Sequence, residues 1–203
     1  MISIEGYPVS IGKLQQQDLD SLQKHYLPLI LDGTEFTPQG TGSRISKNAS
    51  QKFSGKEYDN FFDKFNNTIQ PGPYIESYID SFMFQFPYKL ELDTWFNVYN
   101  QYDHQQFHNH IGTNVPAFSC VVLLKQPNPD AGQFVFRQPS FSNHLKYLEL
   151  DPYDQYPNIY KPLMEDGLIM IFPSCLEHYV FYNQTNESRV IFSTNIVVKR
   201  EDI

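Results

Sequence analysis

Residues 94–111, "TWFNVYNQYDHQQFHNHI", give the clearest indication of the fold. It holds two short runs rich in aromatic and β-branched residues, Thr94–Tyr99 and Phe107–Ile111, which are typical of β-strands. The second run carries His108 and His110, two residues apart. Because side chains of a strand alternate between its faces, both imidazoles are expected to point the same way. The stretch therefore predicts β-structure with two candidate metal ligands on one face.

From Leu92 onward the hydrophobic pattern has a period of two, and turn-forming stretches such as "KQPNPDAG" and "YNQTNES" interrupt it. Few of the predicted strands have a helix between them, which favours a sandwich or a barrel over a parallel α/β sheet. Two long polar or Tyr- and Pro-rich segments, 32–54 and 140–162, are expected to shape the mouth of this fold. The further candidate strands are Ala117–Lys125, Gln133–Phe136, Gly167–Phe172, His178–Tyr182 and Arg189–Lys199.

The first part of the chain has helical patterns instead. One apolar stripe at helical spacing begins at Leu19 and ends at Ile30. A second helix is predicted to begin at Ser54, with Glu57 completing a capping box, and a third at Pro73. We therefore expect one domain over residues 1–203, mainly β with N-terminal helices (α+β), in which residues 1–91 form a helical support for a β core at 92–199.

Composition narrows the class of protein. Hydrophobic residues make up 40% and aromatic residues 16%, so a chain of 203 residues can bury an aromatic-rich core. The formal charge of −8, without a basic run, disfavours nucleic-acid binding. The N-terminus lacks a signal-peptide pattern, and no apolar run approaches the ~20 residues of a membrane helix. With only Cys120 and Cys175, which we interpret as reduced thiols, a cytoplasmic protein without membrane contact is expected.

Two further segments supply chemistry that fits the two histidines. His178 begins a candidate strand, and neighbouring strands of a sandwich bring distant residues together, so His108, His110 and His178 could bind one divalent metal at ~2.0–2.1 Å. Imidazole suits Fe, Zn, Cu and Ni alike. On the last strand, Arg189, Ser193 and Asn195 share a face. A guanidinium beside a hydroxyl favours a carboxylate, and a buried arginine needs an anion to meet it.

The pattern Trp95, Asn97, His108, His110, together with "PAFSCVVLLK", "GQFVFRQP", "DGLIMIFPSCLEHYV" and "SRVIFSTNI", resembles Fe(II)/2-oxoglutarate oxygenases related to prolyl 4-hydroxylases. The most similar branch occurs in marine bacteria and phages. The resemblance covers roughly residues 92–199. It implies a double-stranded β-helix (a jelly roll, cupin-like) that holds Fe(II) and uses 2-oxoglutarate and O2. A phage-encoded member would act in the host cytoplasm.

The resemblance also implies roles for particular residues. His108 and His178 would be iron ligands and catalytic, and Arg189 would bind the distal carboxylate of 2-oxoglutarate. Ser193 would assist Arg189, and Asn97 would face the cosubstrate from a neighbouring strand. Such a site couples oxidative decarboxylation of 2-oxoglutarate to hydroxylation of a peptide or protein residue or of a small molecule.

Two departures from the usual pattern leave alternatives open. His110 stands where the family usually has an aspartate. It is either the third ligand, or it lies just outside the ligands and a water or another residue completes the site. The strand after the histidines has Val122, Leu123 and Leu124 where many relatives use a tyrosine against the cosubstrate. Two other functions also remain: a cupin-type metalloenzyme with three histidines and no 2-oxoglutarate, and a non-catalytic jelly-roll module. Arg189 argues against the first of these.

Overall fold

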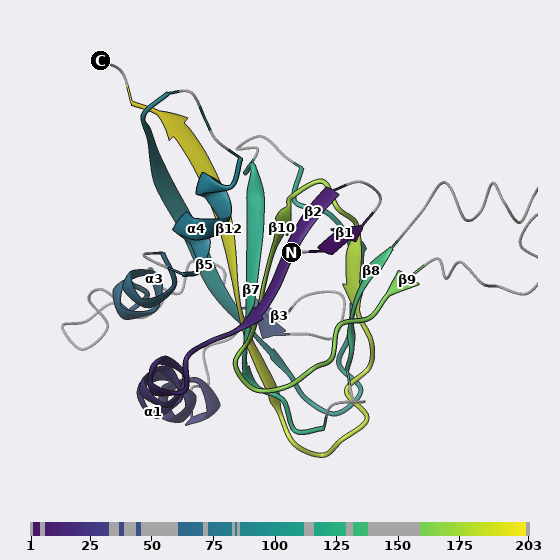
Figure 1. Ribbon diagram of the computed structural model, residues 1–203. Coiled ribbons are helices and arrows are strands. Elements are labelled where there is room, and N and C mark those ends of the chain that lie inside the picture. The colour runs from purple at the N-terminus through teal and green to yellow at the C-terminus, as the bar shows by residue number, and fades with distance from the viewer. Residues whose placement is uncertain are drawn as a thin grey trace, which may run out of the picture.

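Two antiparallel β-sheets form the body of the protein, and helices cover the outer face of the larger sheet (Figure 1). The structure is a computed structural model. It describes residues 2–4, 7–32, 37–38, 44–45, 61–70, 73–82, 84, 86–111, 116–128, 132–137 and 159–201. Among these residues, no helix is long and apolar enough to cross a membrane.

The larger sheet has eight strands in the order β1-β2-β10-β7-β12-β5-β4-β3, and the smaller has four in the order β6-β11-β8-β9. The strands of the larger sheet are β1 Ile2–Ile4, β2 Tyr7–Lys13, β3 Thr37–Pro38, β4 Arg44–Ile45, β5 Tyr88–Tyr99, β7 Phe118–Lys125, β10 Leu168–Pro173 and β12 Arg189–Arg200. Those of the smaller sheet are β6 Gln105–His108, β8 Phe134–Arg137, β9 Ile159–Tyr160 and β11 His178–Val180.

From β5 to β12 the chain passes back and forth between the two sheets. Strands β5, β7, β10 and β12 pair side by side in the larger sheet, while β6, β8 and β11 pair in the smaller sheet that faces it. This is the winding of a jelly roll. The predicted double-stranded β-helix with N-terminal helices is confirmed.

Among the described residues, three helices pack on the outer face of the larger sheet: α1 Gln16–Asp32, α3 Asp63–Ile69 and α4 Ile75–Asp80. Figure 1 shows α1 and α3 on the side of that sheet opposite β8 and β9. The predicted stripe of α1 is confirmed, since Leu19, Leu22, Tyr26 and Ile30 are buried. The predicted start of the second helix, with Ser54 and Glu57, lies outside the described residues, and α4 begins two residues after Pro73.

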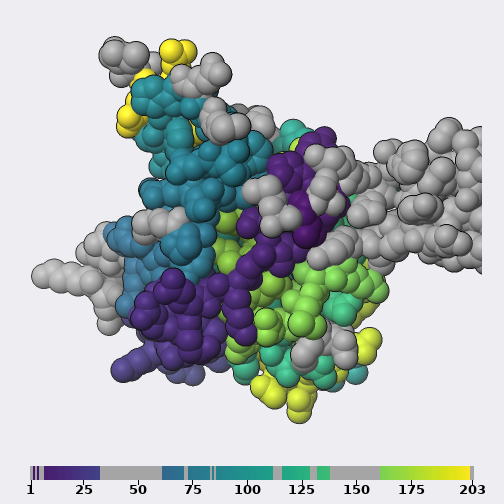
Figure 2. Space-filling model, viewed as in Figure 1, coloured from purple at the N-terminus to yellow at the C-terminus, as the bar shows by residue number. Residues whose placement is uncertain are grey.

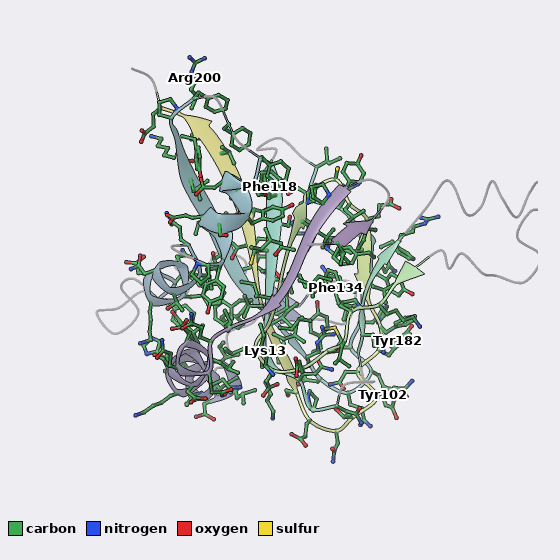
Figure 3. All side chains as sticks on the ribbon, in the orientation of Figure 1. Lys13, Tyr102, Phe118, Phe134, Tyr182 and Arg200 are labelled. Atoms are coloured by element: carbon green, nitrogen blue, oxygen red, sulfur yellow. The ribbon has the colours of Figure 1, made fainter. Side chains whose placement is uncertain are left out.

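The larger sheet separates two hydrophobic cores. Because side chains alternate along each strand, Phe96, Val122 and Phe192 pack toward the helices, whereas Leu123 and Ile191 face the smaller sheet. On the helix side, the rings of Phe65 and Phe192 stack with centroids 4.2 Å apart. On the other side, Phe134 of β8 lies between the sheets, as Figure 3 shows. Both faces of the central strands are therefore buried, which explains their nearly continuous apolar sequence.

Three features of the sequence-based prediction need correction. The N-terminal part contributes strands as well as helices, because β2 pairs with β10 in the larger sheet; Figure 2 shows this purple segment across the surface beside the green strands. Strand β5 begins at Tyr88, before the predicted Thr94. Strand β6 is Gln105–His108 instead of Phe107–Ile111, so His110 lies in the loop after the strand.

Candidate functional site

His108 and His178 meet across two paired strands of the smaller sheet. They are direct partners in the antiparallel ladder between β6 and β11, and their ring centroids lie 4.2 Å apart. His110 joins them from the loop after β6, with its ring centroid 5.3 Å from that of His108 and 5.1 Å from that of His178. One ring nitrogen of each residue lies within 4.8 Å of the others. The three predicted imidazoles therefore converge on one point.

Each imidazole is oriented by a hydrogen bond at Nδ1. In His108 this atom lies 2.8 Å from the carbonyl oxygen of Gln106, and in His178 it lies 2.9 Å from that of Leu176. In His110 it lies 2.5 Å from Oδ1 of Asn195. All three partners are acceptors, so Nδ1 carries the proton and Nε2 keeps its lone pair. This is the tautomer a metal requires, fixed in the way that outer partners usually fix metal-binding histidines.

The surroundings of His178 keep it uncharged. The residue is buried, and its ring stacks on Phe134 with centroids 5.0 Å apart, while Phe136 and Phe172 contact its other sides. Burial first, and then the neighbouring His108 and His110, hold the pKa of His178 well below its usual 6.5. A neutral imidazole in an apolar setting is a ready ligand, because metals bind the unprotonated form.

Arg189 is the largest fully buried side chain among the described residues. It begins β12, and its guanidinium carbon lies 5.5 Å from the ring centroid of Tyr99, its ladder partner on β5. One amino group donates to the carbonyl of Gly132, but Nε and the other amino group are buried and have no hydrogen-bond partner among the described residues. Burial lowers the pKa of Arg189 to about 10, against a smaller opposing effect of Tyr99, so the charge persists at neutral pH. A planar guanidinium with free donors can bind a carboxylate through two parallel hydrogen bonds.

Gly132 makes room for this arginine. Its φ of +59° is a left-handed conformation that favours glycine, as the sequence predicted for a turn. A Cβ at this position would lie 3.2 Å from an amino nitrogen of Arg189. The glycine therefore serves both the backbone turn and the close approach of the guanidinium.

Asn97 and Ser193 lie on the same inner face, on β5 and β12. Nδ2 of Asn97 donates to Oγ of Ser193 at 3.1 Å, and both side chains are buried. Oδ1 of Asn97 has no hydrogen-bond partner among the described residues. Buried polar atoms normally find a partner, so this oxygen is available to a bound molecule or a water. The predicted placement of Asn97 on the strand next to Arg189 agrees with this geometry.

Three contacts of the site were not predicted, although the sequence placed Asn195 on the face of Arg189 and Trp95 in the family pattern. Tyr99 packs against Arg189 from β5, whereas a tyrosine was sought on the strand at 118–125. Asn195 supports His110, and Trp95 stacks on the same ring with centroids 5.7 Å apart. Tyr99 and Trp95 follow from the period of β5, because they share its inner face with Asn97. Their partners depend on pairing between distant strands, which no local pattern reveals.

The donor set fits an iron and 2-oxoglutarate. Three neutral imidazole nitrogens suit a divalent transition metal, and the buried guanidinium of Arg189, with two donors unpaired among the described residues, suits the far carboxylate of a dicarboxylic acid. The jelly-roll fold and the three converging histidines are those of a metalloenzyme. The comparisons give this class a family.

A sequence model of the family described as "Putative 2OG-Fe(II) oxygenase" matches residues 93–195, and the chain belongs to this family. Its members are oxidoreductases that use Fe(II), 2-oxoglutarate and O2. The resemblance inferred from the motifs is thereby confirmed. No curated protein matches the sequence.

Solved structures share the fold at low sequence identity. A prolyl-4-hydroxylase from Pseudomonas putida is 12% identical with a TM-score of 0.61, and the match covers 97% of this chain and 94% of that one. HygX from Streptomyces hygroscopicus, with nickel and 2-oxoglutarate bound, is 12% identical with a TM-score of 0.62, and the match covers 95% of this chain and 82% of HygX. A viral collagen prolyl hydroxylase from Paramecium bursaria Chlorella virus-1 is 14% identical with a TM-score of 0.55 over 97% and 99%.

Proposed function

We propose that this oxygenase is a hydroxylase of a peptide or protein residue or of a small molecule, and that its site is the histidine and arginine cluster described above. One observation carries the proposal: three imidazoles, each with a ring nitrogen within 4.8 Å of the others, converge in the barrel. The same barrel buries a guanidinium that has no ion pair among the described residues. The proposal includes a cytoplasmic location, which suits the free thiols of Cys120 and Cys175.

Each residue has a distinct role in this proposal. His108, His110 and His178 hold the iron through Nε2, and their Nδ1 hydrogen bonds keep the rings in place. Arg189 binds the distal carboxylate of 2-oxoglutarate. Ser193 and Asn97 line the path between Arg189 and the histidines. The Ser193 hydroxyl donates to the cosubstrate, and Asn97 holds that hydroxyl in place through Nδ2.

When bound, Fe(II), 2-oxoglutarate and O2 together supply an oxidant that converts a substrate C–H bond to C–OH, while 2-oxoglutarate becomes succinate and CO2. The chain contributes orientation and a dry setting. Phe134, Phe136 and Phe172 exclude water from the inner side of His178. Such exclusion strengthens the electrostatic attraction between Arg189 and a bound carboxylate.

The substrate class rests on the structural neighbours. Two of them are prolyl hydroxylases, and HygX has also been crystallised with hygromycin B. The fold is therefore compatible with both peptidyl and small-molecule substrates. The segments expected to shape the substrate mouth, 32–54 and 140–162, lie largely outside the described residues.

Two other functions were compatible with the sequence. A three-histidine enzyme without 2-oxoglutarate has no use for a buried guanidinium that lacks an anion. A non-catalytic jelly roll has no use for three imidazoles oriented through Nδ1. Arg189 and the three hydrogen bonds therefore favour the oxygenase.

The test is turnover of the cosubstrate. Purified protein is loaded with Fe(II), and succinate formation is followed with and without 2-oxoglutarate, first alone and then with proline-containing peptides or polar metabolites. We expect succinate only when both iron and 2-oxoglutarate are present, and none from Arg189→Met. The matched control is Arg137→Met, which removes a surface arginine paired with Glu177 at 3.2 Å and should retain turnover. Oxygen consumption at the same rate with and without 2-oxoglutarate would overturn the proposal.

A second experiment tests where the cosubstrate binds relative to the metal and Arg189. N-oxalylglycine is an inert mimic of 2-oxoglutarate, and a structure of the metal-loaded protein with this mimic tests both ends of the pocket at once. We expect its oxo-acid end on the metal and its far carboxylate on Arg189. A mimic that stays outside the barrel would contradict the assignment.

A further inference from the structure

His110 lies beyond the end of β6, and contacts from other elements position it. Strand β6 ends at His108, so alternation along the strand does not aim the His110 side chain. Its backbone N–H donates to the carbonyl of Ser174 at 2.9 Å, which fixes the loop beside β10. The ring itself must be oriented by other contacts.

Those contacts come from the larger sheet. Asn195 of β12 places Oδ1 2.5 Å from Nδ1 of His110, and Trp95 of β5 stacks on the same ring at an interplanar angle of 25°. Both supports belong to paired strands, because Trp95 lies opposite Ser193 in the ladder and Asn195 follows two residues later. The third imidazole therefore spans from the edge of one sheet to the inner face of the other.

The other two histidines are held differently. His108 and His178 each use a backbone carbonyl two residues earlier in the chain. Substitution of a side chain cannot remove those acceptors. Among the contacts of the described residues, His110 is the one imidazole of the three whose Nδ1 uses a side-chain acceptor, and that acceptor is a neutral amide.

We propose that Asn195 is a positioning residue that fixes His110 as a neutral nitrogen ligand of the metal. This inference rests on the proposed metal site. The amide oxygen holds the proton on Nδ1, which leaves the Nε2 lone pair directed at the ion. A carboxylate at this position would orient the ring equally well but would add negative charge next to the centre.

The first test is the affinity for Co²⁺ alone, measured by competition titration at one pH. Loss of an outer hydrogen-bond partner typically costs 10–100-fold in metal affinity, so we expect that loss for Asn195→Leu. Asn195→Asp keeps the acceptor and should stay within a few-fold of the wild type. The matched control is Thr194→Val, which removes a hydroxyl from the opposite face of the same strand, where Thr194 contacts Thr94 at 3.0 Å. It should bind Co²⁺ like the wild type.

A second readout follows the ring directly. In the Co²⁺-loaded protein, each ligand imidazole gives a paramagnetically shifted proton signal from Nδ1–H that exchanges with D2O. We expect the His110 signal to vanish in Asn195→Leu and to return in Asn195→Asp. A merely structural role for Asn195 would not move this signal selectively. Its persistence in Asn195→Leu overturns the inference.

The variant His110→Ala distinguishes a failure of the proposed metal site from a failure of the proposed role of Asn195. If His110→Ala leaves the Co²⁺ affinity unchanged, His110 is not a ligand, and that part of the proposed function fails together with this inference. If His110→Ala weakens binding but Asn195→Leu does not, the metal site stands and only the role of Asn195 is wrong.

Discussion

At the scale of single residues, Arg189 carries a charge that the described protein leaves half-satisfied. Burying a cation is costly unless an anion meets it, and no ion pair of Arg189 occurs among the described residues. The Gly132 carbonyl and the Tyr99 ring offset only part of this cost. The site is therefore held in readiness for a ligand at the expense of stability.

Replacing Arg189 by methionine should separate stability from binding. Replacing an uncompensated buried charge by an apolar side chain of similar length is often neutral or stabilising. We therefore expect the free energy of unfolding to stay unchanged or to rise by about 1–2 kcal/mol. Binding of N-oxalylglycine to the metal-loaded protein should be lost. Urea unfolding and calorimetric titration measure the two effects. A strongly destabilised variant that still binds the mimic contradicts this account of Arg189.

His178 should make the metal-free protein sensitive to acid. Burial lowers its pKa in the folded state, whereas the unfolded chain has the usual value near 6.5. Between these two values the unfolded state binds more protons, so the free energy of unfolding falls as the pH falls below about 6.5. The loss approaches about 1.4 kcal/mol per pH unit for one such group.

Urea unfolding of the metal-free protein between pH 7.5 and 5 measures this slope. His178→Leu removes the titrating group but keeps an apolar side chain among the phenylalanines, so its stability should depend less steeply on pH. Equal slopes for the two proteins would show that the acid sensitivity arises elsewhere.

At the scale of elements, β6 is the strand that a metal bound at the three histidines should stabilise most. It has four residues, lies at the edge of the smaller sheet, and pairs with β11 through an interrupted register. A metal bound by His108, His110 and His178 would tie it to β11 and, through Asn195, to β12. Short edge strands with few ladder bonds open at low free-energy cost, so the tie should be measurable.

Hydrogen exchange of the backbone amides tests this. With free Co²⁺ at 100 times its Kd, an opening that releases the metal should cost about 2.7 kcal/mol more, which slows exchange of the β6 amides about 100-fold. Removal of the ion with a chelator should restore fast exchange there. Amides of β7, in the middle of the larger sheet, provide the internal control. Equal protection of both strands by Co²⁺ would argue against a metal bound through β6.

The elements also show what sequence can and cannot predict. Strands such as β7 and β12 were predicted within a residue, because period and turn residues are local signals. The meeting of His108 with His178, and the burial of Arg189, followed from a family resemblance and the expected sandwich. The convergence of His110 was predicted for a partly wrong reason, since it lies beyond β6. Its supports, Trp95 and Asn195, depend on the register between β5 and β12, which no single segment encodes.

At the scale of the whole molecule, the larger sheet keeps the aromatic core apart from the site. Residues that alternate along β12 face either the helices or the barrel interior. The helix side supplies packing through Phe192, and the barrel side supplies Arg189, Ser193 and Asn195. Figure 3 shows Tyr102 and Tyr182 at the end of the molecule opposite Arg200, the last residue of β12, so this strand runs along much of the fold.

Substitutions at two neighbouring residues of β12 should therefore have different effects on stability and on ligand binding. Phe192→Ala empties a fully buried site against Phe65 and should cost about 3–5 kcal/mol of unfolding free energy, with Co²⁺ affinity unchanged in the folded fraction. Ser193→Ala removes the acceptor of Asn97 and should cost only about 1–3 kcal/mol while weakening N-oxalylglycine binding. Unfolding curves and ligand titrations of the two variants make the comparison. If Phe192→Ala instead weakened binding of N-oxalylglycine as much as Ser193→Ala, packing on the helix side would affect the site. The two faces of β12 would then have to move together.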